Sequence, residues 1–110
     1  MLEGIFGNRT AERVLLHVFH YGGIYASAIA HDYQTAINPM KLQLERFENA
    51  GVLVSKEMGR TRVYSFNPKS PLTSPVIELI KIVYESIPSK EREQLFKIRR
   101  RPRRKGKPVL

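Results

Sequence analysis

Residues 38–46 carry side chains that can contact the edges of base pairs. The amide groups of Asn38 and Gln43 can each form a two-pronged contact with adenine, and Leu42 can touch a thymine methyl group. Lys41 and Arg46 can bind guanine or hold phosphate groups. The same residue types also form an ordinary solvated helix face, so their chemistry depends on the elements that position them.

A helix over residues 38–50 is predicted to carry this set. Met40, Leu44 and Phe47 recur at the spacing of one helical face, which leaves the opposite face open to a ligand. Asn38 is expected to be the N-cap of the helix, because its side chain can accept a hydrogen bond from the first turn.

A β-hairpin is predicted directly after this helix. The segment 61–66 alternates in the period of a strand, the segment 52–57 is its predicted partner, and Gly59 lies in the polar break between them. Cations near the turn are expected to hold the DNA backbone or enter a minor groove: Lys56, Arg60 and Arg62. A helix followed by such a hairpin indicates a winged-helix fold.

Two further helices are predicted before the segment 38–50. The first begins near Thr10 as N-cap and carries one apolar stripe toward the core. The second covers residues 25–32, with Ser27 near its start, where a hydroxyl and free backbone N–H groups can meet a phosphate. Residues 33–37 form the turn into the next helix, in the order of a helix-turn-helix.

The predicted helix over residues 74–86 is apolar on more than one face. The surplus surface is buried either under a fifth helix, 89–97, or against a second copy of the chain. We favour the dimer, because contiguous exposed apolar surface marks a partner site. The residues expected to form the dimer contact are Val76, Ile80, Val83 and Tyr84.

The net charge of +9 is concentrated at the C-terminal end. Residues 97–107 contain eight of the 19 cations and no acid, which leaves eleven cations against ten acids in residues 1–96. We therefore divide the chain into a nearly neutral domain, 1–96, and a flexible basic tail, 97–110, that attracts polyphosphate. A solubility or localisation tail is the alternative. The tail arginines expected to contact DNA are Arg99, Arg100, Arg101, Arg103 and Arg104.

Composition argues against several other classes. A length of 110 residues fits one domain, and without cysteine there is no disulfide framework or thiolate metal site. No apolar run reaches the length of a membrane helix, so we expect a cytoplasmic, nucleoid-associated protein with no membrane partner. His17 and His20 are three residues apart, but we expect a partly exposed polar face rather than a metal site. No catalytic motif or cofactor loop is present, and neither an enzyme nor a cofactor is expected.

The order of three helices, hairpin and long C-terminal helix over residues 10–84 resembles the ArsR-like and MarR-like winged helix-turn-helix regulators. The strongest local match is LERFENAGVLVSKEMGRTRVYSFNP. The resemblance implies a mainly α fold with a small β-hairpin (α+β) and a C-terminal dimerisation helix. It also implies a dimeric repressor that binds double-stranded DNA at a pseudo-palindromic operator. The effector ligand is unknown. Two alternatives stay open: a winged-helix adaptor for protein interaction, or a non-specific nucleic-acid-binding protein that uses its tail.

Overall fold

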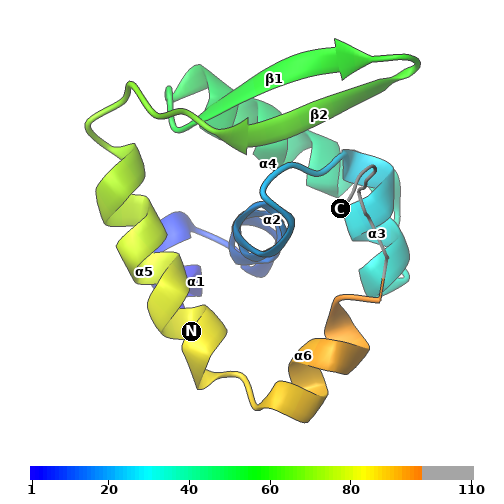
Figure 1. The fold of residues 1–110 in the computed structure, drawn as a ribbon, viewed down its shortest axis with the longest axis vertical. Coiled ribbons are helices and arrows are strands. Elements are labelled where there is room, and N and C mark those ends of the chain that lie inside the picture. Colours follow the sequence, from blue (N-terminus) through cyan, green and yellow to red (C-terminus); the bar gives the residue numbers. More distant parts are fainter. Residues whose placement is uncertain (98–110) are drawn as a thin grey trace, which may run out of the picture.

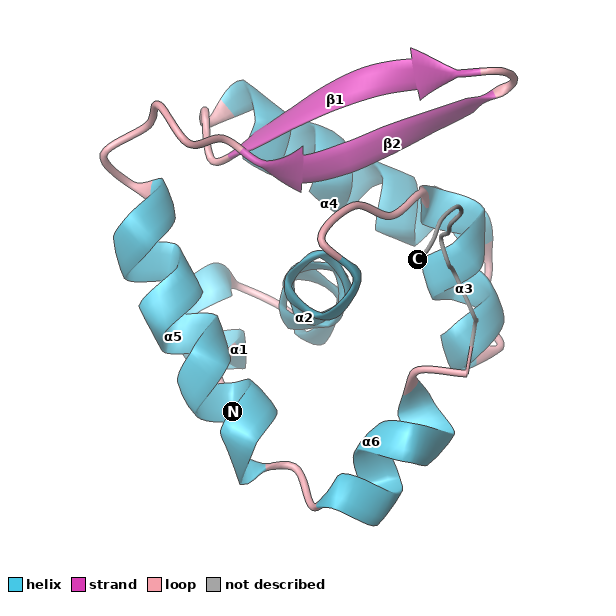
Figure 2. Ribbon diagram, in the orientation of Figure 1, coloured by secondary structure: helices cyan, strands magenta, loops and turns pink. Residues whose placement is uncertain are grey.

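The computed structural model describes residues 1–97, which are mainly helical with one two-stranded antiparallel sheet (Figures 1 and 2). The expected α+β class is therefore confirmed for this part of the chain. The elements are α1 (Glu3–Phe6), α2 (Arg9–Tyr21), α3 (Ala26–Tyr33), α4 (Ile37–Asn49), β1 (Leu53–Met58), β2 (Thr61–Phe66), α5 (Thr73–Ser86) and α6 (Ser89–Leu95).

Helix α2 is the centre of the molecule. It is seen end-on in Figure 1, with α5 on one side, α3 on the other and α4 with the hairpin above it. Its apolar residues repeat at helical spacing and are removed from water by the surrounding elements, which is the main force that stabilises such a core. Fully buried side chains from four helices form the centre of this core: Val14, Leu15, Val18, Ile29, Leu44 and Ile80.

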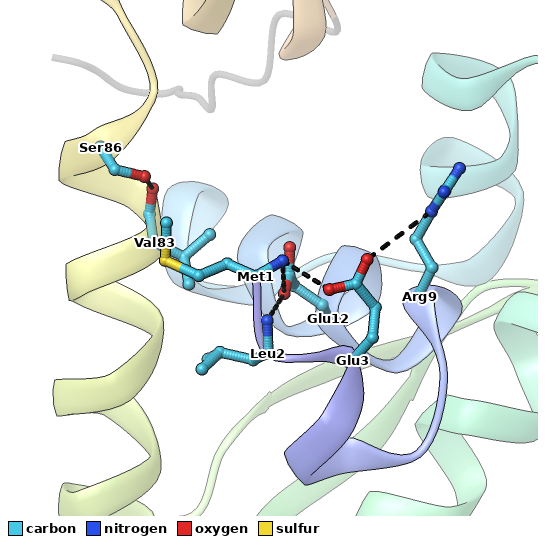
Figure 3. Close-up of polar contacts among 7 residues, drawn as sticks. All are labelled: Met1, Leu2, Glu3, Arg9, Glu12, Val83 and Ser86. Atoms are coloured by element: carbon cyan, nitrogen blue, oxygen red, sulfur yellow. Dashed lines mark hydrogen bonds and ion pairs between the residues drawn. The ribbon is translucent and has the colours of Figure 1, made fainter.

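The start of α2 differs from the sequence prediction. The Asn8 side chain accepts a hydrogen bond from the Ala11 N–H at 2.7 Å, so Asn8 is the N-cap and Thr10 lies inside the first turn. Helix α1 precedes it and was not predicted, because four residues are too few to show a helical period. Figure 3 shows the polar contacts here, where Glu3 and Glu12 bind the terminal ammonium of Met1.

Helix α4 also begins earlier than predicted. Its N-cap is Ala36, which makes no side-chain cap, so the expectation that Asn38 caps this helix is wrong. Asn38 instead lies exposed in the first turn. The predicted inward face is confirmed, because Met40, Leu44 and Phe47 are all buried.

The hairpin pairs Leu53 with Phe66 through to Met58 with Thr61. Gly59 is at the turn with φ +66, a left-handed conformation that glycine adopts without strain. A short antiparallel bridge between Ile24 and Tyr64 adds a third segment beside β2. Its two backbone hydrogen bonds have N to O distances of 3.0 and 2.8 Å. It ties the chain before α3 to the hairpin, so these two elements are held together.

Helix α5 directs part of its apolar surface into the core of its own chain. Ile80 and Val83 are buried, and Val76 and Tyr84 are partly buried against the same core. The expectation that these side chains form a dimer contact is therefore wrong for Ile80 and Val83, because a partner cannot reach them. The exposed apolar residue of this helix is Ile82, with 60 % of its surface accessible.

Candidate nucleic-acid interface

The outer face of α4 carries most of the side chains singled out for base contact. Burial of Met40 and Leu44 turns the opposite face of the helix to solvent. Asn38, Lys41 and Leu42 are exposed on it, and 63 % of the Leu42 surface is accessible. The fold therefore brings these three residues together on one accessible surface.

Asn49 was not predicted from the sequence as a contact residue, and it extends this surface. It is exposed at the C-terminal end of α4. Two residues that are eleven positions apart in a helix lie three turns apart on nearly the same face. The position of Asn38 therefore predicts that Asn49 shares its face. We name the exposed set Asn38, Lys41, Leu42 and Asn49 the outer α4 face.

Gln43 is not a member of the outer α4 face. It follows Met40 by three residues and precedes Phe47 by four, which places it at the edge of the buried stripe. Its side chain is partly buried, and its Oε1 atom is enclosed without a hydrogen-bond partner in the described part of the chain. In this conformation Gln43 cannot present both amide atoms to a base.

The Arg46 side chain is exposed, but its guanidinium group already contacts other residues of the chain. Its Nη2 donates to the Phe6 carbonyl at 2.7 Å, and its guanidinium lies 5.2 Å from the centre of the Phe47 ring. These contacts tie α1 to α4. The expectation that Arg46 reads bases does not fit this geometry, in which the guanidinium turns toward α1 rather than outward.

The hairpin cations do not share one face. Because side chains alternate along a strand, Arg62 lies on the face of buried Tyr64, whereas Lys56 lies on the opposite face beside Val63. Arg60 is exposed at the turn. A single strand of DNA approaching the hairpin would therefore meet Arg60 with one of the other two cations, not all three.

Arg62 belongs to a hydrogen-bond chain that reaches α4. Its Nη1 donates to Ser55 Oγ at 2.8 Å, and that hydroxyl donates to Glu48 Oε2 at 2.6 Å. Arg62 Nη2 also lies 3.7 Å from Glu57 Oε2. These two hydrogen bonds fix the hairpin against α4. Arg62 therefore helps to set the angle between the hairpin and α4, and it also supplies a positive charge.

Ser27 is exposed in the first turn of α3. The side chain of the N-cap residue, Tyr25, does not cap this turn. Backbone N–H groups at a helix start favour an anion. Ser27 therefore keeps the position that a phosphate contact requires.

The charge of this surface is small. On α4, Lys41 and Arg46 are balanced by Glu45 and Glu48, and the hairpin adds three cations against Glu57. The surface is polar and weakly positive rather than strongly basic. The arginines that supply most of the charge, Arg99, Arg100, Arg101, Arg103 and Arg104, lie outside the described residues.

A buried pair of side chains, His17 of α2 and Asp32 of α3, joins these two helices. The expectation that His17 lies on a polar exposed face is wrong, because its side chain is fully buried. Its Nε2 donates to Asp32 Oδ2 at 2.8 Å, and its Nδ1 lies 3.2 Å from the Arg13 carbonyl. The centre of the Phe96 ring lies 4.8 Å from the centre of the His17 ring. The same ring stacks on His20, with the two ring centres 4.0 Å apart. Within residues 1–97 no group of histidine and acidic side chains is arranged to hold a metal.

The buried pair predicts a pH-dependent stability. Burial lowers the pKa of His17 below 6.5, and the Asp32 contact opposes this only in part. The unfolded chain therefore takes up a proton first on acidification, and stability should fall as the pH drops below 6.5. This one group can contribute at most about 1.4 kcal/mol per pH unit. NMR titration of the His17 ring proton should give a midpoint below 6.5, and a midpoint above it would contradict the assignment.

No family model matches the chain, and a search of curated proteins finds no relative. No helix of the described residues has the length and apolar character to cross a membrane.

Proposed function

We propose that this chain is a winged helix-turn-helix protein that binds double-stranded DNA and regulates transcription, most simply as a repressor. In this proposal α3 and α4 are the helix-turn-helix, α4 enters the major groove, and β1–β2 is the wing. The single observation that carries the proposal is the outer α4 face, whose side chains are exposed. Ser27 in the first turn of α3 and Arg60 at the hairpin turn are exposed as well.

The outer α4 face has the composition of a base-reading surface. The amide of Asn38 can bind adenine, Lys41 can bind guanine or phosphate, and Leu42 can contact a thymine methyl group. Asn49 adds an amide three turns further along the groove. Because the charge around these groups is nearly balanced, the domain is suited to reading sequence while the tail supplies general attraction.

We further propose that the protein acts as a homodimer in the cytoplasm, on DNA of the nucleoid. The dimer is proposed from the resemblance to dimeric winged-helix regulators, and Ile82 of α5, which is 60 % accessible, is the residue we expect at the contact. A two-fold symmetric dimer places two copies of α4 in successive major grooves. Its binding site is then an inverted repeat.

Selection of bound sequences from random duplexes tests this function. We expect enrichment of an inverted repeat whose half-sites are about one helical turn, 10–10.5 base pairs, apart. An enriched single half-site would support DNA reading by a monomer and reject the dimer. Retention of DNA without any enriched sequence would reject sequence-specific regulation and favour binding through the tail.

A second candidate function is a protein-interaction adaptor. It is favoured by the exposed apolar residues Ile37 and Leu42, which are 47 % and 63 % accessible on α4. Such residues can seat a partner as well as a thymine methyl group. The same selection separates the two functions, because an adaptor has no preferred duplex.

A further inference from the structure

Leu42 is the most exposed large apolar side chain of α4, with 63 % of its surface accessible. The buried residues Met40, Leu44 and Phe47 fix which side of the helix faces the core. At about 100° of rotation per residue, Leu42 lies about 140–160° around the helix axis from each of these three residues. Its side chain therefore projects from the side of α4 that faces away from the core.

Two exposed amides share this side of α4 with Leu42. Asn38 lies one turn before Leu42 and Asn49 two turns after it, and both are within about 40° of Leu42 around the helix axis. Glu45 lies on the same side, but its side chain is partly buried. Burial raises the pKa of Tyr64 on the hairpin, and the nearby negative charge of Glu45 raises it further, so the Glu45 carboxylate lies near β2. The exposed groups are therefore one apolar side chain between two amides.

An apolar side chain in the major groove has one favourable partner. The edges of the base pairs carry hydrogen-bond donors and acceptors there, and the C5-methyl group of thymine is the only apolar group among them. A leucine placed against an amino group or a carbonyl oxygen displaces water without replacing its hydrogen bond, which is unfavourable. In the groove, Leu42 should therefore favour thymine and disfavour cytosine, whose amino group occupies the same edge.

The spacing of Asn38 and Leu42 relates this thymine to a second base. A rise of about 1.5 Å per residue separates the two residues by about 6 Å along α4. Neighbouring base pairs are about 3.4 Å apart along the duplex. With α4 lying along the groove, the two side chains then meet base pairs about two steps apart. The amide of Asn38 fits adenine, because it can donate and accept at the same time.

We propose that Leu42 is a specificity-determining residue that recognises the C5-methyl group of one thymine in each half-site, about two base pairs from the adenine bound by Asn38. The inference rests on the proposed function and deepens it, because it specifies two base pairs of the binding site. It also specifies the atom group by which one of them is read. Recognition at the Leu42 position depends on a methyl group and not on a hydrogen bond.

Replacement of single thymines by deoxyuridine in the duplex selected by the full chain tests this inference. The replacement removes the methyl group and keeps every hydrogen-bonding group of the base. At one thymine of each half-site, about two base pairs from an adenine, it should weaken binding about fourfold, as expected for one methyl group buried in the complex. In the Leu42→Ala variant the same replacement should have no effect, because the side chain that covers the methyl group is absent.

Leu72→Ala is the matched control, since Leu72 is the N-cap residue of α5 and is 54 % accessible. This variant should keep the sensitivity of the native chain to deoxyuridine. If a sequence is selected but no deoxyuridine replacement weakens binding, the inference is overturned and the proposed function stands. Equal sensitivity of the native chain and Leu42→Ala also overturns it, because another residue then reads the methyl group. If no sequence is selected from random duplexes, the proposed function fails and this inference fails with it.

Discussion

Truncation of the chain after Phe96 should make DNA binding much less sensitive to salt. The truncated segment carries eight cations, and each phosphate contact contributes about 0.9 to the slope of log affinity against log salt. If all eight cations contact phosphates, the slope should decrease by about 7. Electrophoretic mobility shift or fluorescence anisotropy at several salt concentrations gives both slopes.

The truncation should leave the folded domain intact. Phe96 is buried against α2 and α5, whereas Lys97 is exposed, so the cut follows the last buried residue of the described chain. An unchanged melting temperature is the control for folding. A second control, in which the tail sequence is shuffled at constant charge, should keep the original slope. Equal slopes for the full and truncated chains would contradict a DNA-binding tail.

Replacement of Asp32 by alanine should lower the free energy of unfolding by about 2–4 kcal/mol. The change removes the acceptor of a fully buried histidine and leaves the His17 Nε2–H without a partner. It also removes the unpaired Oδ1 atom, which offsets part of the loss. Urea denaturation with an unchanged m-value provides the measurement.

Glu93→Ala is the matched control for this stability prediction. Glu93 is an exposed acid on α6, and surface substitutions of this kind change stability by about 0.5 kcal/mol or less. Asp32→Asn should lie between the two variants, because the amide oxygen can still accept from His17. If Asp32→Ala were no more destabilising than Glu93→Ala, the buried pair would have no structural role.

Local patterns in the sequence were sufficient to predict most of the helices and both strands. The spacing of Met40, Leu44 and Phe47 fixed the inward face of α4, because helical periodicity depends only on neighbouring residues. The same geometry assigns Gln43 to the edge of that face, which agrees with its partly buried side chain. Four-residue α1 has too few residues to produce any such pattern.

Contacts between distant parts of the chain were not predictable in this way. Arg46 binds the carbonyl of Phe6, forty residues earlier, and His17 pairs with Asp32, fifteen residues later. Nothing in the residue types of either segment specifies the partner, because these contacts follow from how the helices pack. For the same reason the sequence could not show that Ile80 and Val83 face the core of their own chain.

The ratio of specific to non-specific DNA affinity shows whether the outer α4 face reads base pairs. The ratio should be measured on the best selected duplex and on an unrelated duplex, for the native chain and for Asn38→Ala, Lys41→Ala and Lys90→Ala. Lys90 is an exposed cation on α6, away from the outer α4 face, and serves as the charge control.

Asn38→Ala should reduce the ratio by the equivalent of about 1–3 kcal/mol, because one two-pronged base contact is removed. Lys41→Ala should reduce it as well if the lysine binds guanine, and should lower both affinities equally if it holds a phosphate. Lys90→Ala should leave the ratio unchanged. If the ratio is the same in the native chain and in the Asn38→Ala and Lys41→Ala variants, the outer α4 face does not read base pairs.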